Sequence, residues 1–592
     1  MKNNYYTVRI INEKILFIKE LVNYFNIKDS KLKLETDKIS ESELLSLIKV
    51  IVPEQYDKFI SIINDYNSYF LNCKKLNEKE IYPSYTLCMH PSRKCNLNCK
   101  YCFAVDNENL PTEEIDIELA KKAINFMVYN WGKDARKFTV DIAGSGEPLL
   151  KLDFVKELSS YCKNLHYKTG KEIKIMFPSN GTLMTPKIAD YFENENNILL
   201  GFSLDGNKLQ NGNRMKKNGE WAYDDSVQGI NMIKKRKYGI AVTITHLNED
   251  VDEVYDFLIN NFKNVDAISM QVVREYSNSD VSFYNIDIQN LLLHYKKLTE
   301  KILCNFDKKK YEYILPLLLG ADTFGAYFLR VISKGKIHRF RCGAGRCIVS
   351  VDNTGKLYSC SVENGNSEYE IGDIFNGIDE EKVAMFSHPT ADFNSDCKSC
   401  WASYICGGEC FVTAKKSRNN FYLSNKSVCE FRKGLIEICI IFAQTLLENY
   451  PKAYEYIIKT LKKRTFFESI VDSSAWAMGH YLDIKNIDYK YEDIECMLDS
   501  SDIGTSPENL KQVLNRYSKG FTFYEITDEK CMDEIKLPAI ALLNRMDNMY
   551  YEYAVIKKVN DNVLTLKTNF NDDDLNVPVD DFFDRCSNIV GF

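Results

Sequence analysis

The chain has 592 residues, of which 45% are hydrophobic, 27% charged and 12% aromatic, a balance that indicates several folded domains and excludes a disordered chain. Its formal net charge is −7 and it has no lysine- and arginine-rich stripe, which argues against a nucleic-acid partner. It begins without an apolar signal-peptide core, and no window approaches the roughly 20 apolar residues of a membrane span. We therefore expect a cytoplasmic protein with neither a nucleic-acid nor a membrane partner.

Residues 1–84 are predicted to form a small separate α+β domain. Ser40 and Glu43 have the spacing of a capping box, in which the serine caps a helix and the glutamate reaches back to the backbone. An apolar helix is expected to follow. Pro53 suits the first turn of a second helix, which would run to about Leu71.

From residue 85 to about residue 273, short β-rich segments alternate with amphipathic helical ones. The six β-rich segments are TLCMH, FTVDIA, IKIMF, LLGFSL, IAVTIT and ISMQVV. Such alternation predicts a parallel α/β sheet or barrel. Because a complete barrel has eight strands, six segments predict a partial (β/α)6 barrel of the TIM type. Together with the mainly helical residues 274–339, it forms a predicted domain at 85–339.

Two further blocks follow the predicted barrel. Residues 340–435 are rich in cysteine, glycine and turns, and residues 436–592 are helical first and β-rich toward the end. Cytosolic thiols stay reduced, so metal ligation explains the clustering of the 19 cysteines better than disulfides do. Eight scattered cysteines are instead expected to be small buried hydrophobes: Cys73, Cys88, Cys162, Cys304, Cys439, Cys496, Cys531 and Cys586.

Cys95, Cys99 and Cys102 form a CxxxCxxC loop, KCNLNCKYCFA, directly after the first predicted strand. A [4Fe–4S] cluster normally takes four thiolates, so three closely spaced ligands leave one iron open for chemistry. Barrel enzymes place their chemistry at the carboxyl ends of their strands, which is where this loop is expected. A zinc knuckle with its fourth ligand elsewhere is the alternative.

The segment CNLNCKYCF resembles the signature of the radical S-adenosylmethionine (SAM) family. This resemblance implies that the three cysteines hold a cluster whose open iron binds the amino and carboxylate groups of SAM. One electron then cleaves the sulfonium C–S bond, giving methionine and a 5′-deoxyadenosyl radical that abstracts a substrate hydrogen. An electron donor such as flavodoxin or ferredoxin is implied as a partner.

Further segments resemble the SAM-binding elements of this family, in the same order along the chain. GSGEP at 144–148 resembles the element that holds the SAM amino group, with Ser145 in place of a glycine. Arg214 lies one residue before the position of the family's SAM-carboxylate arginine, without the usual preceding His-Asp. The SAM site implied by the resemblance consists of Tyr101, Gly144, Ser145, Gly146, Glu147, Pro148, Asn180, Ser203, Asp205 and Arg214.

The cysteines between 342 and 429 resemble the SPASM extension of peptide- and protein-modifying radical SAM enzymes. The resemblance implies two auxiliary [4Fe–4S] clusters and hence three clusters in all. The distal set is Cys397, Cys400, Cys406 and Cys429; the proximal set is Cys342, Cys360 and Cys410, with Cys347 as the fourth ligand. Some thioether-forming relatives lack that fourth ligand. A structural zinc ribbon is the alternative.

The same residues suggest a substrate class. Ser361 stands where the sulfatase-maturing branch has an aspartate base, which weighs against sulfatase activation. LCMHPSRKCNLNCKYCFA and CGAG resemble maturases of Cys-rich ribosomal peptides, which implies thioether links from cysteine sulfur to carbon in a precursor peptide with a leader. The alternatives are carbon–carbon or other cross-links, modification of a folded protein subunit, and a non-catalytic peptide-binding scaffold. No catalytic residue beyond the cofactor ligands is assigned.

Both ends of the chain are candidates for leader recognition. Relatives often pair an N-terminal strand with the leader peptide, although a helical cap on the barrel is an equal alternative for residues 1–84. The end of the chain resembles papain-like peptidases that cleave bacteriocin leaders. Ser473 or Ser474 stands at the cysteine position, Tyr551 or Glu552 at the histidine position and Thr568 at the aspartate position. We therefore expect an inactive peptidase fold that binds leaders; an interaction or dimerisation domain is the alternative.

Overall fold

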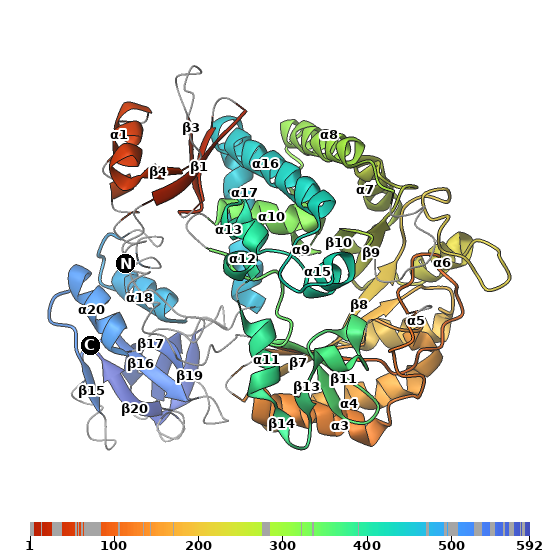
Figure 1. Ribbon diagram of the computed structural model, residues 1–592. Coiled ribbons are helices and arrows are strands. Elements are labelled where there is room, and N and C mark those ends of the chain that lie inside the picture. Colours follow the sequence, from red (N-terminus) through yellow and green to blue (C-terminus); the bar gives the residue numbers. More distant parts are fainter. Residues whose placement is uncertain are drawn as a thin grey trace.

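Six parallel strands form the centre of the structure, a computed structural model of the chain (Figure 1). All six segments predicted as strands form strands, and they lie side by side in chain order, which confirms the α/β class. They are β5 (Ser84–Met89), β6 (Lys137–Asp141), β7 (Glu172–Ser179), β8 (Ile198–Ser203), β9 (Tyr238–Ile244) and β10 (Val265–Val272).

The structure describes most of residues 5–51 and nearly all of 84–468. It also describes 473–489, 507–525, 535–544, 551–560, 563–567, 574–579 and 586–592, with isolated residues between them. Within this part of the chain, no single helix has the length and hydropathy of a membrane span. One pair of helices, Tyr311–Leu319 and Thr323–Ile332, passes that test only when taken together, and it is bent by 105°.

One face of the parallel strands packs against helices. In β9, Tyr238, Ile240, Val242 and Ile244 are buried, whereas the residues between them are not, as strand alternation requires. The helices between the strands are α3 (Ile117–Phe126), α4 (Leu152–Thr169), α5 (Pro186–Asn194), α6 (Tyr223–Ile230) and α7 (Val251–Asn261), and α8 (Ile288–Asp307) follows β10. The opposite face is less buried, as Gly239, Ala241 and Thr243 of β9 illustrate.

The cysteine-rich segment extends the same sheet. Its first strand, β11 (Ile348–Val351), pairs in parallel with β5, and β12 (Lys356–Tyr358), β13 (Glu370–Asp373) and β14 (Gly377–Ile378) continue it in antiparallel fashion. Consequently Cys347, just before β11, and Cys360, just after β12, lie beside the first barrel strand. The helices that follow are α11 (Glu380–Ser387), α12 (Thr390–Phe393), α13 (Ser395–Lys398), α14 (Ser403–Cys406) and α15 (Phe411–Arg418).

A second sheet lies at the N-terminus, in the order β3-β2-β1-β4. Its strands are β1 (Tyr5–Ile11), β2 (Ile15–Ile18), β3 (Asn23–Asn26) and β4 (Lys38–Ser40), followed by α1 (Glu41–Ile51). The capping box is confirmed, because the Ser40 N–H donates to Glu43 Oε2 at 2.7 Å and the Glu43 N–H donates to Ser40 Oγ at 3.3 Å. Most of the helix predicted from Pro53 to Leu71 lies outside the described residues.

The N-terminal sheet packs against the helices that carry the distal cysteines. Phe17 meets the Trp401 ring edge-on at 5.6 Å, Arg9 pairs with Glu437 at 2.6 Å, and the Lys19 ammonium donates to the Lys398 carbonyl at 2.9 Å. Figure 1 shows this sheet, in red, next to α16 (Lys426–Asn449), which carries Glu437. Residues 1–84 thus contribute to the surroundings of a cysteine group.

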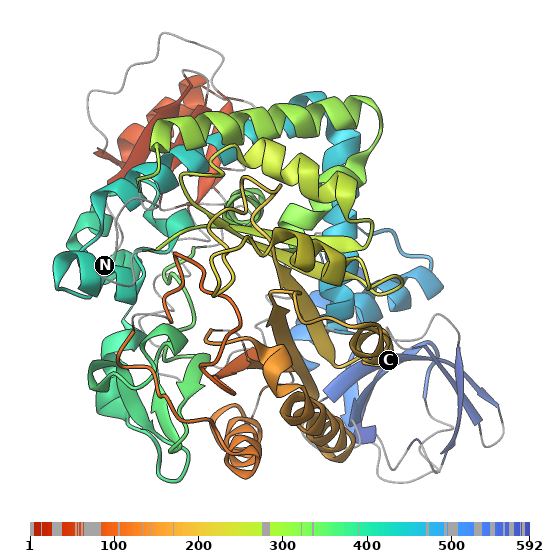
Figure 2. The same ribbon diagram turned by 90° about the vertical axis from the view of Figure 1, so that its right-hand side faces the viewer.

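The C-terminal block is helical first and β-rich later, as predicted. Its last part is a six-stranded antiparallel sheet in the order β15-β20-β16-β17-β18-β19, which lies apart from the central sheet (Figure 1, Figure 2). The elements are α16 (Lys426–Asn449), α17 (Pro451–Glu468), α18 (Ser473–Ile484), α20 (Pro507–Tyr517), β15 (Phe523–Glu525), β16 (Ala539–Asn544), β17 (Tyr551–Asn560), β18 (Val563–Lys567), β19 (Leu575–Pro578) and β20 (Cys586–Gly591).

Helix α16 crosses the predicted boundary between residues 435 and 436. Its buried side chains on both sides of that point, Leu435 and Ile440 among them, belong to the same core as the parallel strands, and this core extends to Ile457 in α17. Two smaller cores lie between α18, α20 and the terminal sheet and within that sheet. Any experiment that removes the C-terminal block must therefore cut after α17.

Candidate functional site

The residues predicted to bind SAM lie together at the carboxyl ends of β5 to β8. The cysteine loop follows β5, residues 144–148 follow β6, Asn180 follows β7, and Ser203 and Asp205 lie at the end of β8. Because parallel strands end at one edge of a sheet, residues far apart in the sequence meet here. Tyr101 and Arg214 come from farther along the long loops that follow β5 and β8.

Backbone hydrogen bonds fix the cysteine loop against two other segments. The Asn98 N–H donates to the Met215 carbonyl at 2.7 Å and the Lys100 N–H donates to the Asn213 carbonyl at 3.0 Å. The Glu147 N–H donates to the Lys94 carbonyl at 2.9 Å. The loop is therefore held on one side by the segment that carries Arg214 and on the other by the GSGEP loop.

The three thiols of this loop are close enough to interact electrostatically. Burial raises the pKa of Cys95 and raises that of Cys99 to about 11, and the neighbouring thiols add to this effect while Arg214 opposes it. A buried thiolate of this kind needs a metal to be stable. Among the described residues, no three His, Cys, Asp or Glu side chains converge tightly enough to hold a single ion. Three thiols from one loop are the donor set that a [4Fe–4S] cluster with one open iron would take.

Glu147 is almost fully buried and ties two strand ends together. Its carboxylate accepts hydrogen bonds from the Asn180 N–H and the Ser179 hydroxyl, both at 2.8 Å, and from the Leu149 N–H at 3.1 Å. Burial raises its pKa, and these donors oppose the rise. Asn180 in turn donates to Asn96 Oδ1 at 2.9 Å, inside the cysteine loop. The GSGEP loop thus positions both the end of β7 and the cysteines.

Gly146 permits the close contact between these loops. It has a φ of +77°, and a Cβ there would lie 2.1 Å from the Ser92 carbonyl oxygen and 2.7 Å from that of Lys94. We predict that Gly146→Ala lowers the free energy of unfolding by about 2–5 kcal/mol, as backbone strain adds to overpacking. Gly219→Ala is the matched control: its φ is +84° with nothing within 4 Å of the new Cβ. It should cost only about 1–2 kcal/mol. Urea unfolding of both variants measures this, and equal losses would contradict the assigned contact.

Tyr101, Asp205 and Arg214 form a buried group beside Cys99. The Tyr101 hydroxyl donates to Asp205 and accepts a hydrogen bond from Arg214 Nη1 at 2.6 Å, and Asp205 and Arg214 form an ion pair at 3.9 Å. Burial raises the pKa of Asp205, and Arg214 opposes this. Nε of Arg214 is buried without a hydrogen-bond partner among the described residues. A buried cation with an unused donor next to the cysteine loop fits an anionic ligand such as a carboxylate.

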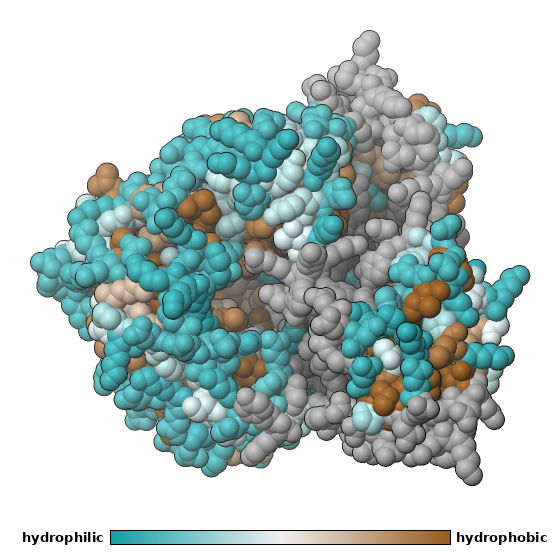
Figure 3. All heavy atoms as spheres, turned by 180° about the vertical axis from the view of Figure 1, so that it is seen from behind, coloured by the Kyte–Doolittle hydropathy of each residue, from teal (hydrophilic) through white to brown (hydrophobic). Residues whose placement is uncertain are grey.

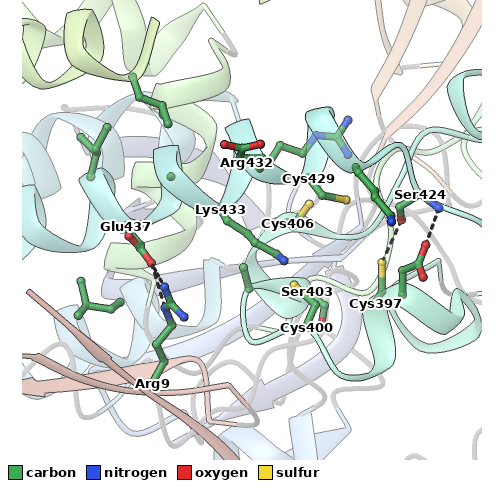
Figure 4. A pocket seen from close by; sticks show the side chains of 18 of the residues that line it. Arg9, Cys397, Cys400, Ser403, Cys406, Ser424, Cys429, Arg432, Lys433 and Glu437 are labelled. Carbon is green, nitrogen blue, oxygen red and sulfur yellow. Dashed lines mark hydrogen bonds and ion pairs between the residues drawn. The ribbon is translucent and has the colours of Figure 1, made fainter. Parts of the chain in front are cut away.

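The eight remaining predicted ligands form two groups. In the distal group, the Cys397 thiol interacts with those of Cys400, Cys406 and Cys429, and burial raises its pKa to about 12. Figure 4 shows these four sulfurs around one cavity of about 1120 Å³, with Lys433 and the Arg9–Glu437 pair at its side. The side chains come from α13, α14 and α16 and the turn between α13 and α14.

In the proximal group, the Cys360 thiol interacts with those of Cys410 and Cys342, and burial raises its pKa to about 12. Cys347 lies next to this group, because a Cβ on Gly343 would come within 2.4 Å of its Sγ. Gly407 allows the segment before Cys410 to approach the segment before Cys342. Its φ is +79°, and a Cβ there would lie 2.3 Å from the Phe340 carbonyl oxygen. The structure therefore brings together the four distal cysteines and, in the proximal set, Cys342, Cys360 and Cys410. The role of Cys347 as the fourth proximal ligand stays a prediction.

Two residues near the proximal group were not singled out by the sequence. Cys88, expected to be a plain buried hydrophobe, lies near the end of β5 with its Sγ 4.0 Å from Asp141 Oδ2, and its thiol interacts with that of Cys360. Register explains the contact, because Cys88 and Asp141 are direct partners in neighbouring strands. Both residues lie near the carboxyl ends of barrel strands, and this position is the sequence feature that could have identified them as site residues.

Comparison with known proteins agrees with this geometry. The family model described as the radical SAM superfamily matches residues 89–258. A serine-type anaerobic sulfatase-maturating enzyme from Bacteroides thetaiotaomicron is 26% identical over 359 residues, covering 55% of this chain and 82% of the relative. The radical SAM cyclopropyl synthase TigE from Paramaledivibacter caminithermalis is 22% identical over 392 residues, covering 63% and 75%.

One solved structure shares the fold over most of the described chain. Native anSMEcpe with bound AdoMet superimposes with a TM-score of 0.51 at 20% identity, covering 62% of this chain and all of that one. This likeness concerns the fold alone. The residue roles at the site rest on the contacts described above.

Proposed function

We propose that this chain, which carries a radical SAM domain over residues 89–258, is an enzyme that forms thioether cross-links in a ribosomally made, Cys-rich peptide. The observation that carries the proposal is the meeting of three thiols with a buried arginine at the edge of a parallel sheet, next to two further thiol groups. The three thiols and the arginine would form the cluster and SAM site that a radical SAM enzyme needs. The two further thiol groups would hold clusters that remove a second electron from the substrate.

The residues at the first site divide the work of holding the cofactors. When bound, a [4Fe–4S] cluster and SAM supply a substrate radical through reductive cleavage of SAM. Cys95, Cys99 and Cys102 would hold the cluster, and the Arg214 guanidinium would bind the SAM carboxylate. Residues 144–148, Tyr101, Asn180, Ser203 and Asp205 would supply the rest of the SAM site. In this assignment Glu147 holds loops in place and Asp205 holds Arg214 in place, and their contacts support these roles.

The two further thiol groups are proposed to hold the auxiliary clusters. The distal one uses Cys397, Cys400, Cys406 and Cys429. The proximal one uses Cys342, Cys360 and Cys410 with Cys347, whose sulfur lies beside the residue that follows Cys342. Their reduction potentials would be set by burial and by hydrogen bonds to sulfur.

A peptide substrate is supported by the named activities of relatives and by one residue. A sulfatase-maturating enzyme acts on a protein, and a cyclopropyl synthase is similar over 63% of this chain. Ser361 lacks the carboxylate expected of a sulfatase activator. Carbon–carbon or other cross-links, modification of a folded protein subunit, and a silent peptide-binding scaffold remain the alternatives, and an electron donor such as flavodoxin or ferredoxin is part of the proposal.

Anaerobic co-expression with a candidate Cys-rich precursor tests the function. Mass spectrometry should show the loss of two hydrogen atoms per link and protection of the linked cysteines from alkylation. A loss of two hydrogen atoms with all thiols still reactive toward alkylation would contradict a thioether and would indicate a carbon–carbon link instead. An unchanged peptide, together with no 5′-deoxyadenosine from fully loaded enzyme, would favour the scaffold.

We further propose that the C-terminal block binds the leader. The positions compared with a peptidase's cysteine and histidine begin α18 and β17, and these two elements pack together in one core. Thr568 lies outside the described residues. Hydrophobic residues gather at the lower right of Figure 3, where this block lies. Large hydrophobic side chains that the block exposes include Tyr524, Leu537 and Val563. A chain cut after Glu468 should bind leader peptide more weakly in equilibrium binding; equal affinity would reject this role.

A further inference from the structure

Tyr327 in α10 (Thr323–Ile332) contacts a distal cysteine and the arginine that precedes a proximal one. Its side chain is 1% exposed. Its hydroxyl oxygen is 3.8 Å from the Sγ of Cys406, a distal cysteine, and accepts a hydrogen bond from Arg341 Nη1 at 3.0 Å. Arg341 directly precedes Cys342, a proximal cysteine, and its charge acts on the Cys342 thiol.

Two more guanidinium groups surround the same place. Arg330, one turn after Tyr327, donates to the carbonyls of Ile405 at 2.7 Å and Cys406 at 3.1 Å. Arg432 in α16 is buried and donates to the Gly408 carbonyl at 3.1 Å. Its charge acts on thiols of both groups, Cys406 and Cys410. Arg330, Arg341 and Arg432 are called the arginine bridge below.

The arginine bridge carries more positive charge than nearby acids offset. Among the described residues, its one ion pair joins Arg432 to Glu409 at 3.0 Å. Arg330 and Arg341 bond instead to carbonyl and hydroxyl oxygens. Guanidinium groups keep their charge in proteins, and burying them without anions is costly. Burial accordingly lowers the pKa of Arg330, as do the charges of Arg341 and Arg432. An anion between these groups would remove the imbalance.

The surrounding thiols can supply that anion. A [4Fe–4S] core with four thiolate ligands carries a net negative charge, which grows by one unit on reduction. Positive charge and hydrogen bonds to sulfur favour the reduced state and raise the reduction potential. Since Arg341 already donates to the Tyr327 oxygen, the hydroxyl hydrogen is available to Cys406 Sγ.

We propose that the arginine bridge, with Tyr327 at its centre, raises the reduction potentials of both auxiliary clusters and makes the pair an electron acceptor. The proposal rests on the proposed function, because it requires clusters in both cysteine groups. Arg330 acts on the distal cluster, Arg341 on the proximal one, and Arg432 on both. These are positioning residues that hold charge near the clusters and do not touch substrate.

EPR-monitored redox titration of the anaerobically reconstituted full-length protein tests the bridge. Arg330→Gln should lower the distal potential and Arg341→Gln the proximal one, each by a tenfold change in the equilibrium constant for reduction, about 59 mV for one electron. Arg330→Lys keeps the charge and should restore most of the distal potential. Tyr327→Phe should lower the distal potential through loss of the bond to sulfur.

Arg339→Gln is the matched control. It removes the same charge two residues before Arg341, but this side chain pairs with Asp392 at 3.5 Å outside the bridge. The reduction potentials of both auxiliary clusters in the Arg339→Gln variant should equal those of the unaltered protein. If the arginine and tyrosine variants also titrate unchanged with full iron content, the bridge has no such role while the proposed function stands. If the unaltered protein shows no auxiliary clusters, both fail.

Discussion

Replacing Cys95, Cys99 and Cys102 together by alanine is expected to abolish 5′-deoxyadenosine formation and to remove about four iron atoms per chain. The reason is that these thiols are the proposed ligands of the cluster that binds SAM, while the two auxiliary groups lie on separate elements. Iron analysis and chromatographic detection of 5′-deoxyadenosine after anaerobic reduction with SAM measure both effects. The EPR signals of the auxiliary clusters should persist.

Cys304→Ala serves as the control for this experiment. The prediction that Cys304 is buried is wrong, because it is exposed in α8, and it interacts with none of the three thiols of the loop. It should leave iron content and SAM cleavage unchanged. Continued 5′-deoxyadenosine formation by the triple variant would mean that SAM is cleaved at another site, and the assignment of residues 95–102 would have to be abandoned.

The second large effect is expected from Arg214→Met. This change leaves Asp205 buried without its cation, which should lower the free energy of unfolding by about 3–5 kcal/mol. It also removes the charged donor proposed for the SAM carboxylate, which should weaken SAM binding by roughly 10- to 100-fold, since a charged hydrogen bond contributes about 1.5–3 kcal/mol. Urea unfolding and equilibrium dialysis with labelled SAM measure the two losses separately.

The double variant Asp205→Asn/Arg214→Met separates the structural effect from the binding effect. Neutralising the buried carboxylate should restore most of the lost stability, because no unpaired charge remains. SAM affinity should stay low, because the guanidinium is still absent. A double variant that regains SAM affinity along with stability would show that Arg214 only supports the fold.

Local patterns in the sequence predicted the strands and the cysteine sets. The β-rich composition of a short segment is a local property, so all six barrel strands could be predicted from it. The Ser40–Glu43 capping box likewise depends on four residues. The thiol sets followed from a family resemblance in spacing. Arg214 lies one residue away from the position of the family's arginine. The backbone hydrogen bonds between its loop and the cysteine loop nevertheless bring it beside the cysteines.

Long-range contacts account for what could not be predicted. The parallel pairing of β11 with β5 joins residues more than 250 positions apart, and it decides that Cys360 meets Cys88. Arg330 and Arg432 reach the auxiliary groups from two helices about 100 residues apart, and neither has a spacing signal. The boundary at 435 lies in a helix because core packing against the barrel continues through it.

Hyperfine coupling between the cluster at residues 95–102 and SAM tests the central claim most directly. Pulsed ENDOR of the reduced, reconstituted protein with SAM labelled by ¹⁵N in the amino group and ¹⁷O in the carboxylate should show both nuclei bound to one iron. The same cluster signal without coupling to either label, or a zinc ion bound in place of the cluster, would contradict the account.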